Sequence, residues 1–329
     1  IASLVFARAM SSGTEVTLFN APSDGISSVV FAPRDNLLLA SSWDKTVRMY
    51  DADTNVMRAQ YHLAGPVLDC SFEHSQERIF SGGLDRRVVM HDLATGNEFV
   101  LGNHDDAVRC VDHSETLNNV LTAGWDMKLM SWDRRAPTAL ATTAKLPDKA
   151  FSMSLDKHRA VVATAGRRIV IFDLRNLSAP AEDRESPLKF QTRCVRCYPE
   201  QNGFAVASVE GRCGVEFYSE PGRFAFKCHR TREQDVDVVY PVNALAFHPT
   251  YGTFATGGSD GFVNIWDRVH KKRLSQFRKY NTGISSLCFN SDGSLLAVAV
   301  SYTFDEGEKE HPEDSIVIRR VQDSEVKPR

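Results

Sequence analysis

A short pattern that recurs along the chain limits its possible folds more than any other feature. The first copy is residues 42–51, where an Asp-Lys turn joins the end of one strand-like stretch to a second, alternating stretch that closes on Tyr and Asp. Altered copies occupy residues 83–92, 124–133 and 256–267. Each copy therefore predicts a β-hairpin in which two strands flank a tight turn.

These copies recur with a nearly fixed period. Their closing aspartates fall about 40 residues apart, which is typical of WD-repeat propeller blades with four strands each; they are Asp51, Asp92, Asp133 and Asp173. Seven repeats begin near Gly25, Gly65, Asp106, Lys149, Thr192, Tyr240 and Thr282. Because blades that close a ring form one domain, we predict an all-β protein in which residues 11–329 form a single seven-bladed WD-repeat β-propeller.

A short alternating stretch, Glu15–Asn20, precedes the first repeat. We expect it to supply the outer strand of the last blade beside Ser315–Arg319, because this pairing removes an exposed edge and closes the ring. Residues 1–10 are expected to be disordered or extraneous. Their apolar residues lack the basic segment of a signal peptide, and Met10 is followed by residues typical of an initiation site.

Two polar segments interrupt the strand pattern, at Asn176–Ser186 and Thr231–Asp237, and we interpret both as inter-strand loops. No segment has helical periodicity of convincing length. No apolar run reaches the ~18 residues that span a bilayer, so we expect no membrane association. The net charge of −3 argues against direct nucleic-acid binding through bulk electrostatics.

Cysteine and serine motifs give no clear catalytic or metal site. Cys194 and Cys197 form a C-x-x-C pair, which fits half a zinc site or a redox pair, but no second ligand pair has suitable spacing. Buried free thiols are the favoured interpretation. Residues 257–261 match G-x-S-x-G, yet a strand follows where a nucleophile elbow needs a helix. We therefore expect no enzyme activity, no metal and no cofactor.

The third repeat contains four polar and aromatic residues that resemble a catalytic set but have a structural interpretation. In WD repeats a His before the first strand, a Ser or Thr in the second, the turn Asp and the strand Trp form a buried hydrogen-bonded network. The matching residues here are His104, Thr122, Asp126 and Trp132. We expect this network to stiffen the blade, because a fully satisfied buried network is rigid.

Basic residues replace the usual turn residues in the fourth and fifth repeats. Arg167-Arg168 and Arg212 stand at the two turns. The stretch 223–230 alternates, so Lys227 falls on one face of an expected outer strand, next to the strand that begins with Arg212. Such a cluster is either a solvated basic rim or a site for carboxylates or phosphate.

Two tryptophans, Trp43 and Trp125, directly precede a turn Asp. Each either packs against a neighbouring blade or anchors a bound partner, since Trp and Arg dominate interface hot spots.

Several stretches together resemble one family closely. They are Gly25–Val29, Ser41–Asp44, Thr164–Arg168, Phe224–Arg230, Gly257–Asp267 and His311–Asp314. These residues resemble the spindle-assembly-checkpoint WD-repeat protein of the Bub family, the propeller partner of the Bub kinase. The similarity extends from about Glu15 to Arg329 and is more specific than the repeat period.

The resemblance implies a non-catalytic, monomeric propeller that works within complexes. Its upper face would bind a Gle-binding-sequence motif in the Bub kinase and in its pseudokinase relative. It would also read phosphothreonine in Met-Glu-Leu-Thr repeats of the kinetochore scaffold. The implied location is the nucleus, the kinetochore in mitosis, and also the cytoplasm.

The family pattern also implies roles for individual residues. Arg212 and Lys227 match the basic pair that holds the phosphate, and Trp43 matches a tryptophan of the phosphopeptide-recognition face. The kinase motif is assigned to Trp125, Arg193, Arg167 and Arg168. This chain departs from the family at Lys227, where a second Arg is frequent; Lys meets phosphate as a point charge without the bidentate fork.

A related family offers an alternative. The mRNA-export WD-repeat protein of the Rae/Gle family shares similarity at residues 185–189, in the stretch 226–230 and at the tail 327–329, and binds a similar motif in a nucleoporin. Residues 164–168 and 262–267 favour the checkpoint branch instead. An enzyme on a propeller platform would need a clustered nucleophile or metal set, which the sequence does not offer.

Overall fold

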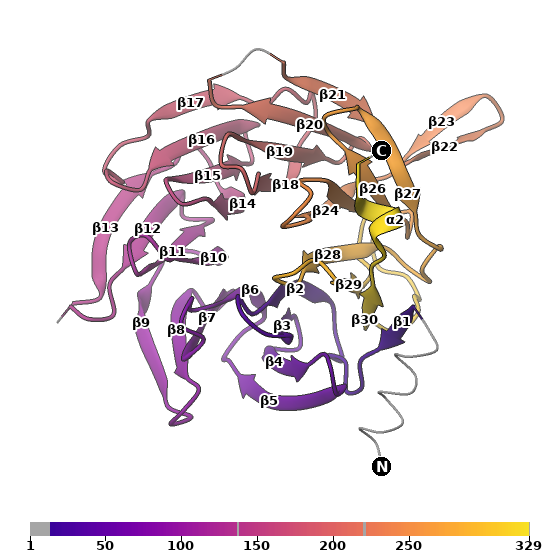
Figure 1. Ribbon diagram of the computed structural model, residues 1–329. Helices are drawn as coiled ribbons and strands as arrows, with labels where there is room; N and C mark the ends of the chain where they lie inside the picture. The colour runs from indigo at the N-terminus through magenta and orange to yellow at the C-terminus, as the bar shows by residue number, and fades with distance from the viewer. Residues whose placement is uncertain (1–13, 137, 220–221, 329) are drawn as a thin grey trace.

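The computed structural model describes residues 14–136, 138–219 and 222–328. Seven four-stranded antiparallel sheets are arranged around a central axis, as Figure 1 shows. This arrangement confirms the predicted all-β, seven-bladed propeller. The expectation for residues 1–10 lies outside the described residues.

The sheets follow one another in chain order around the ring. Blade 1 contains β2 (Ile26–Phe31), β3 (Leu37–Ser42), β4 (Thr46–Asp51) and β5 (Val56–His62), and blade 2 contains β6 (Val67–Phe72), β7 (Arg78–Gly83), β8 (Arg87–Asp92) and β9 (Glu98–Asn103). Blade 3 contains β10 (Val108–Ser114), β11 (Asn119–Gly124), β12 (Lys128–Trp132) and β13 (Leu140–Lys145), and blade 4 contains β14 (Ala150–Leu155), β15 (Arg159–Thr164), β16 (Arg168–Asp173) and β17 (Glu182–Glu185). Blade 5 contains β18 (Thr192–Cys197), β19 (Gly203–Ser208), β20 (Arg212–Phe217) and β21 (Phe224–Lys227), and blade 6 contains β24 (Val242–Phe247), β25 (Phe254–Gly258), β26 (Val263–Asp267) and β27 (Lys272–Gln276). Blade 7 contains β28 (Ile284–Phe289), β29 (Leu295–Val300), β30 (Ser315–Arg320) and β1 (Glu15–Thr17).

The N-terminal strand closes the ring, as predicted. Strand β1 runs antiparallel to β30, with Glu15 opposite Arg319. The Glu15 carboxylate accepts hydrogen bonds from Arg319 at 2.5 Å, Arg278 at 2.6 Å and the Tyr280 hydroxyl at 3.0 Å. Burial alone raises the pKa of Glu15, but these donors outweigh burial and hold its pKa below the ordinary value. The closing strand is therefore fixed by charge as well as by sheet pairing.

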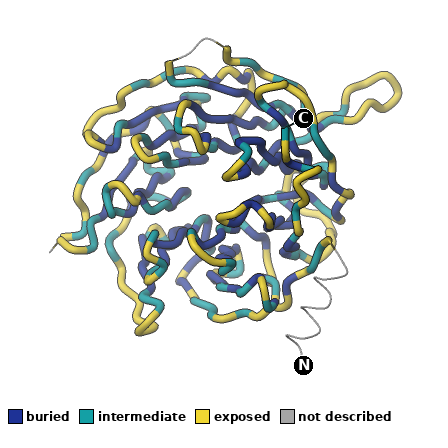
Figure 2. The backbone as a smooth tube through the Cα atoms, viewed as in Figure 1, coloured by how far each residue is buried: buried dark blue, intermediate teal, exposed yellow. Residues whose placement is uncertain are grey.

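The hydrophobic core lies between neighbouring blades. The second strand of blade 2, β7, is almost entirely buried, whereas its outermost strand, β9, is mostly exposed. Figure 2 shows the same change from buried inner strands to exposed outer strands around the ring. One inter-blade cluster joins Phe80 and Val88 of blade 2 to Val108 and Trp132 of blade 3. Each blade thus needs its neighbours to bury both faces.

A common turn joins the second and third strands in most blades. Its second residue has a positive φ at Lys45, Arg86, Met127, Arg167, Gly211 and Gly261. Where the first residue is Asp, its side chain accepts a hydrogen bond from the backbone two residues on, as Asp44 does from Thr46 at 3.0 Å. This Asx turn stabilises the tight reversal. The two blades with basic turns lack this aspartate.

Two predicted loops contain strands instead. The segment 176–186 includes β17, the outer strand of blade 4, and 231–237 lies within a projecting hairpin of β22 (Arg230–Glu233) and β23 (Val236–Val239). Both interpretations as loops were wrong. These strands lie at the exposed edge of a sheet or outside the ring (Figure 1), so neither needs the apolar alternation on which the prediction relied.

The only α-helix in the described part of the chain is the four-residue α2 (Asp323–Val326). It packs against β26 and β27 of blade 6, where the Ser275 hydroxyl donates to the Glu325 carbonyl at 3.0 Å. A single turn is too short for sequence periodicity to reveal. None of the described helical segments is long and apolar enough to cross a membrane.

Candidate functional site

A cavity of about 470 Å³ lies on the face of the ring where the innermost strands of the blades begin, which we call the upper face. Trp43 follows β3 of blade 1, Trp125 follows β11 of blade 3, and Arg193 stands in β18 of blade 5. All three line this cavity, together with Asn243 of blade 6 and Ser285 of blade 7. Residues far apart in sequence thus meet on one face of the ring.

The backbone fixes both tryptophans directly before a turn. The Trp43 N–H donates to the Gly25 carbonyl and the Trp125 N–H donates to the Ala107 carbonyl, each at 2.9 Å. The Trp43 side chain remains 43% exposed, and the Lys149 ammonium lies 5.7 Å from the Trp125 ring centre. Neither ring is buried in the hydrophobic core. This favours the interpretation of both tryptophans as binding anchors.

Four residues of this cavity carry a buried polar atom without a hydrogen-bond partner among the described residues. They are Trp125 Nε1, Arg193 Nε, Asn243 Oδ1 and Ser285 Oγ. Buried polar groups are paired in the great majority of cases, so a concentration of unpaired ones in one cavity indicates a place for a polar ligand. Two of these atoms are donors only and Asn243 Oδ1 is an acceptor, a combination that suits a peptide backbone or an amide.

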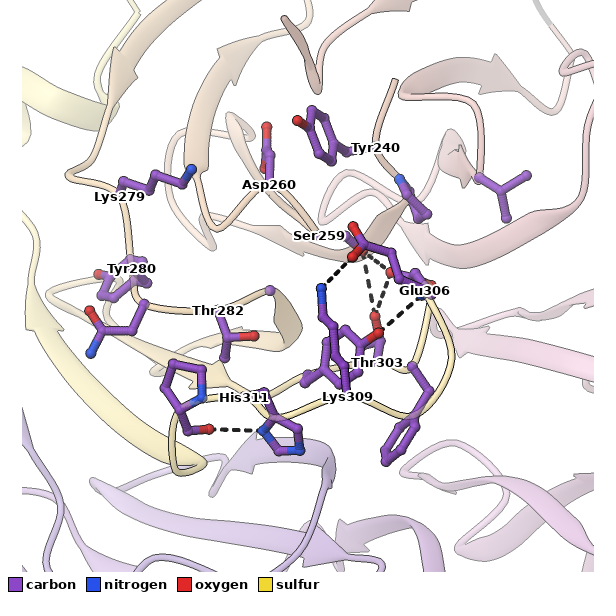
Figure 3. Close-up of a pocket in the computed structure, with 18 of the residues that line it drawn as sticks. Tyr240, Ser259, Asp260, Lys279, Tyr280, Thr282, Thr303, Glu306, Lys309 and His311 are labelled. Atoms are coloured by element: carbon purple, nitrogen blue, oxygen red, sulfur yellow. Dashed lines mark hydrogen bonds and ion pairs between the residues drawn. The ribbon is translucent and has the colours of Figure 1, made fainter. Parts of the chain in front are cut away.

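An acidic loop of blade 7 reaches this cavity. Asp305 forms an ion pair with Arg193 at 2.8 Å and accepts hydrogen bonds from the Thr303 hydroxyl at 2.7 Å and from Ser259. A second cavity of about 750 Å³ shares Arg193 and Thr303 with the first and extends to Val239 on the projecting hairpin. Figure 3 shows part of this cavity, with Ser259, Thr303 and Lys309 grouped around its centre. The two cavities therefore adjoin at Arg193 and at the acidic loop of blade 7.

The predicted phosphate-binding pair lies elsewhere on the upper face. Arg212 begins β20 and Lys227 ends β21, and the two residues are directly opposite each other in the ladder. Their side chains are 35% and 56% exposed, with carboxylates nearby at Glu210 (3.8 Å from Arg212) and Asp237 (3.7 Å from Lys227). Neither lines the tryptophan cavity. Trp43, predicted to join them, instead lies with Trp125 and Arg193.

The paired arginines of the fourth turn are engaged within their own blade. Arg167 forms an ion pair with Glu185, and Arg168 forms one with Asp183 at 2.9 Å; both carboxylates belong to β17. The structure therefore does not bring Arg167 and Arg168 to the cavity that holds Trp125 and Arg193.

The four residues singled out in the third repeat form one continuous network. His104 Nδ1 lies 3.0 Å from both Asp126 oxygens, and His104 Nε2 lies 2.7 Å from Thr122 Oγ1. Trp132 Nε1 donates to the same hydroxyl at 2.7 Å. Burial raises the pKa of Asp126, but the hydrogen bonds from His104 and the Asp105 N–H and the nearby positive charge together outweigh burial, and the pKa is lowered. The four side chains thus form the buried hydrogen-bonded network that the sequence predicts.

A second network of this kind was missed by the sequence analysis. In blade 6, His229 Nδ1 lies 2.8 Å from Asp260, His229 Nε2 lies 2.7 Å from Thr256, and Trp266 Nε1 donates to Thr256 at 3.0 Å. Burial lowers the pKa of His229, but the hydrogen bond to Asp260 and the neighbouring negative charges together outweigh burial, and the pKa is raised. The sequence did contain a signal for this network, because the sixth repeat has the same four residue types at the positions that match those of the third repeat.

The cysteines are free thiols, including Cys194 and Cys197. In blade 5, Cys213 Sγ of β20 lies 3.6 Å from the Sγ of Cys228, which directly follows β21. Across the described ranges no group of three or more His, Cys, Asp or Glu is arranged to hold a metal ion.

Comparisons with known proteins agree with this architecture. The family model for the WD domain, G-beta repeat, matches residues 13–51, 97–133, 227–267 and 271–305. The chain is similar in shape to the crystal structure of RRP9 WD40 repeats, with a TM-score of 0.83 that covers 94% of this chain and 98% of that one. At 13% sequence identity this likeness supports the fold alone. The molecule is thus a WD-repeat propeller with a peptide-sized cavity on its upper face.

Sequence relatives identify the branch of this class. The Mitotic checkpoint protein BUB3.1 of Arabidopsis thaliana is 51% identical, with 97% of this chain and 96% of the relative covered. The Mitotic checkpoint protein bub3 of Dictyostelium discoideum is 45% identical, with 91% and 92% covered. The Poly(A)+ RNA export protein of Schizosaccharomyces pombe is 36% identical, with 96% and 93% covered. The chain belongs to the Bub3 family of mitotic checkpoint WD-repeat proteins, which confirms the predicted resemblance.

Proposed function

We propose that this protein is a non-catalytic adaptor of the spindle assembly checkpoint that carries Bub-type kinases to the kinetochore. A Gle-binding-sequence segment of the kinase, or of its pseudokinase relative, binds in the cavity lined by Trp43, Trp125 and Arg193. The observation that carries this proposal is the convergence of two partly exposed tryptophans, an arginine and unpaired buried polar atoms in one cavity. The proposed sites of action are the nucleus, the mitotic kinetochore and the cytoplasm.

The second part of the proposal concerns phosphate. Arg212 and Lys227 hold the phosphothreonine of Met-Glu-Leu-Thr repeats in the kinetochore scaffold. Phosphothreonine carries about −1.5 to −2 charges and three acceptor oxygens, which two adjacent cations match. The direct pairing of these two residues across β20 and β21 supports the proposal.

Calorimetric titration with phosphorylated and plain scaffold peptide tests the phosphate site. A charge-assisted hydrogen bond contributes roughly 1.5–3 kcal/mol, and ~1.4 kcal/mol corresponds to a tenfold change in affinity. Because both side chains are well exposed, screening lowers this contribution. We expect the Arg212→Ala/Lys227→Ala variant to bind phosphopeptide at least about tenfold more weakly and to retain the kinase segment.

The matched control is Arg167→Ala/Arg168→Ala, which removes the same charge from the upper face of the neighbouring blade. We expect this control to keep the preference for phosphopeptide. A preference lost in the control and kept in the Arg212/Lys227 variant would move the phosphate site to blade 4.

A second candidate function is a role in mRNA export, which the 36% identity to the Poly(A)+ RNA export protein favours. A pull-down from mitotic cells separates the two functions. Recovery of a checkpoint kinase supports the adaptor proposed here, whereas recovery of a nucleoporin in its place supports the export role.

A further inference from the structure

The projecting hairpin places a third cation and a carboxylate beside Arg212 and Lys227. Strands β22 and β23 pair only with each other and are joined by Gln234 and Asp235, which both have positive φ. Figure 1 shows the hairpin extending outward from the ring between blades 5 and 6, and Figure 2 shows that most of it is exposed. Its first residue is Arg230, which directly follows the buried His229 of the blade 6 network.

Arg230 is held firmly although it begins an exposed hairpin. Its neighbour His229 is fixed by Asp260 and Thr256. The Arg230 Nη2 donates to the Glu210 carbonyl at 3.2 Å, in the turn that leads into Arg212. Only 18% of its side chain is exposed, and its Nε is buried without a hydrogen-bond partner among the described residues. Arg230 is therefore directed toward the start of β20.

A carboxylate already lies where these cations meet. The same oxygen of Asp237 lies 3.1 Å from Arg230 Nη1 and 3.7 Å from Lys227 Nζ. The hydrogen bond from Arg230, followed by the charges of Lys227 and Arg230, holds the pKa of Asp237 below its ordinary value. Asp237 stays ionised and fills part of the anion site in the free protein.

Charge counting favours replacement of Asp237 by phosphate. Arg212, Lys227 and Arg230 face two carboxylates, Glu210 and Asp237, so the cluster has a net charge of +1. Withdrawal of Asp237 leaves +2, which matches a phosphate of about −1.5 to −2 charges. An arginine also offers a planar pair of donors that Lys227 lacks.

We propose that Arg230 is a third phosphate-binding residue and that Asp237 is an internal competitor that the phosphate of a bound phosphopeptide displaces. This inference rests on the proposed phosphate site at Arg212 and Lys227. In this proposal the hairpin residues make the site prefer a doubly charged phosphate to a singly charged carboxylate.

Calorimetric titration of the intact protein with phosphothreonine and plain Met-Glu-Leu-Thr peptide tests both residues. Arg230→Ala is expected to weaken phosphopeptide binding about tenfold, in line with a charge-assisted hydrogen bond that is partly screened. Asp237→Asn is expected to strengthen it about two- to fivefold, the effect of removing one exposed ion pair. Binding of plain peptide should change by less than about twofold in both variants.

The tip of the hairpin supplies a matched control. Asp235 forms an exposed ion pair with Arg232 at 3.1 Å and, among the described residues, none with Lys227 or Arg230. Asp235→Asn should therefore leave phosphopeptide affinity within about twofold of the wild type. Arg230→Gln provides a second variant should Arg230→Ala fail to fold, since it keeps a polar side chain of intermediate length and removes the charge together with the guanidinium donors.

The outcomes separate this inference from the proposed function. Unchanged phosphopeptide affinity in Arg230→Ala, with a loss in Arg212→Ala, would overturn the role of Arg230 and leave the phosphate site in place. Weaker or unchanged binding in Asp237→Asn would overturn the role of Asp237 as competitor. No loss in Arg212→Ala, Lys227→Ala or Arg230→Ala would remove the phosphate site altogether.

Discussion

The hydrogen-bonded network of blade 6 and the cavity on the upper face use similar residues in opposite ways. In the network, His229, Thr256, Asp260 and Trp266 are buried or nearly so and bind one another at 2.7–3.0 Å. In the cavity, Trp125 and Arg193 each keep a buried donor without a partner in the described chain. A satisfied polar network stabilises a fold, whereas unpaired buried groups cost stability. The contrast separates Trp266, which serves the fold, from Trp125, for which we propose a role in binding.

The largest expected effect comes from breaking the network. His229→Ala leaves the buried Asp260 carboxylate without its main partner, which typically costs about 3–5 kcal/mol. We expect a loss of this size in the free energy of unfolding, measured by urea denaturation. His62→Ala is the control, because His62 is exposed at the end of β5 and its removal should cost less than about 0.5 kcal/mol. Equal effects of the two substitutions would contradict a stabilising network.

A change in the cavity should affect binding and leave the fold intact. Trp125→Ala is expected to weaken binding of the kinase segment by at least about 2 kcal/mol, as truncation of an aromatic hot spot does. The free energy of unfolding should change by about 1 kcal/mol or less. Calorimetry and urea denaturation measure the two quantities on the same sample.

The control for this prediction is Met127→Ala, two residues further along the same turn. Met127 is 46% exposed and does not line the cavity, so kinase-segment affinity should stay at the wild-type value. A folded Trp125→Ala protein with wild-type affinity would remove Trp125 from the binding site.

The strand that closes the ring, β1, is also held by a polar group whose hydrogen bonds are satisfied. Its contribution to the free energy of unfolding should depend on pH. The lowered pKa of Glu15 in the folded protein means that its charge stabilises the fold above the unfolded value near 4.5, and that this stability is lost as the pH falls. Glu15→Gln should cost about 1–2 kcal/mol of unfolding free energy at pH 7. The difference between the two proteins should shrink on acidification. A difference that is constant with pH would show that the Glu15 charge does not hold the strand.

The smallest expected effect is that of Ser285→Ala, and it sharpens the comparison when it is measured beside Ser286→Ala. Ser286 Oγ accepts a hydrogen bond from the Val29 N–H at 3.1 Å, whereas Ser285 Oγ is buried without a partner in the described chain. Ser286→Ala should therefore cost about 1–3 kcal/mol of unfolding free energy. Ser285→Ala should be neutral or slightly stabilising, by less than about 1 kcal/mol, and should weaken the kinase segment only a few-fold. A Ser285→Ala protein as unstable as Ser286→Ala would mean that Ser285 serves the fold.

The repeat pattern was sufficient for the fold because it is local. Alternating strands and turn aspartates can be recognised within one repeat, and the period of about 40 residues follows from comparing successive repeats. The stretch around Glu15 was also readable, since an isolated alternating strand needs an edge to pair with. The outer strand β17 and the hairpin of β22 and β23 were missed, because strands exposed to solvent need no apolar alternation.

By itself, the sequence determined the number of blades, the closing strand and the residues that depart from the repeat. Only the tertiary structure decided which of those departures meet. It placed Trp43 with Trp125 and Arg193, kept Arg167 and Arg168 within their own blade, and added Asp237 to the cluster at Lys227. The cavity in particular joins blades that lie far apart along the chain, so its geometry depends on closure of the whole ring, which no single repeat encodes.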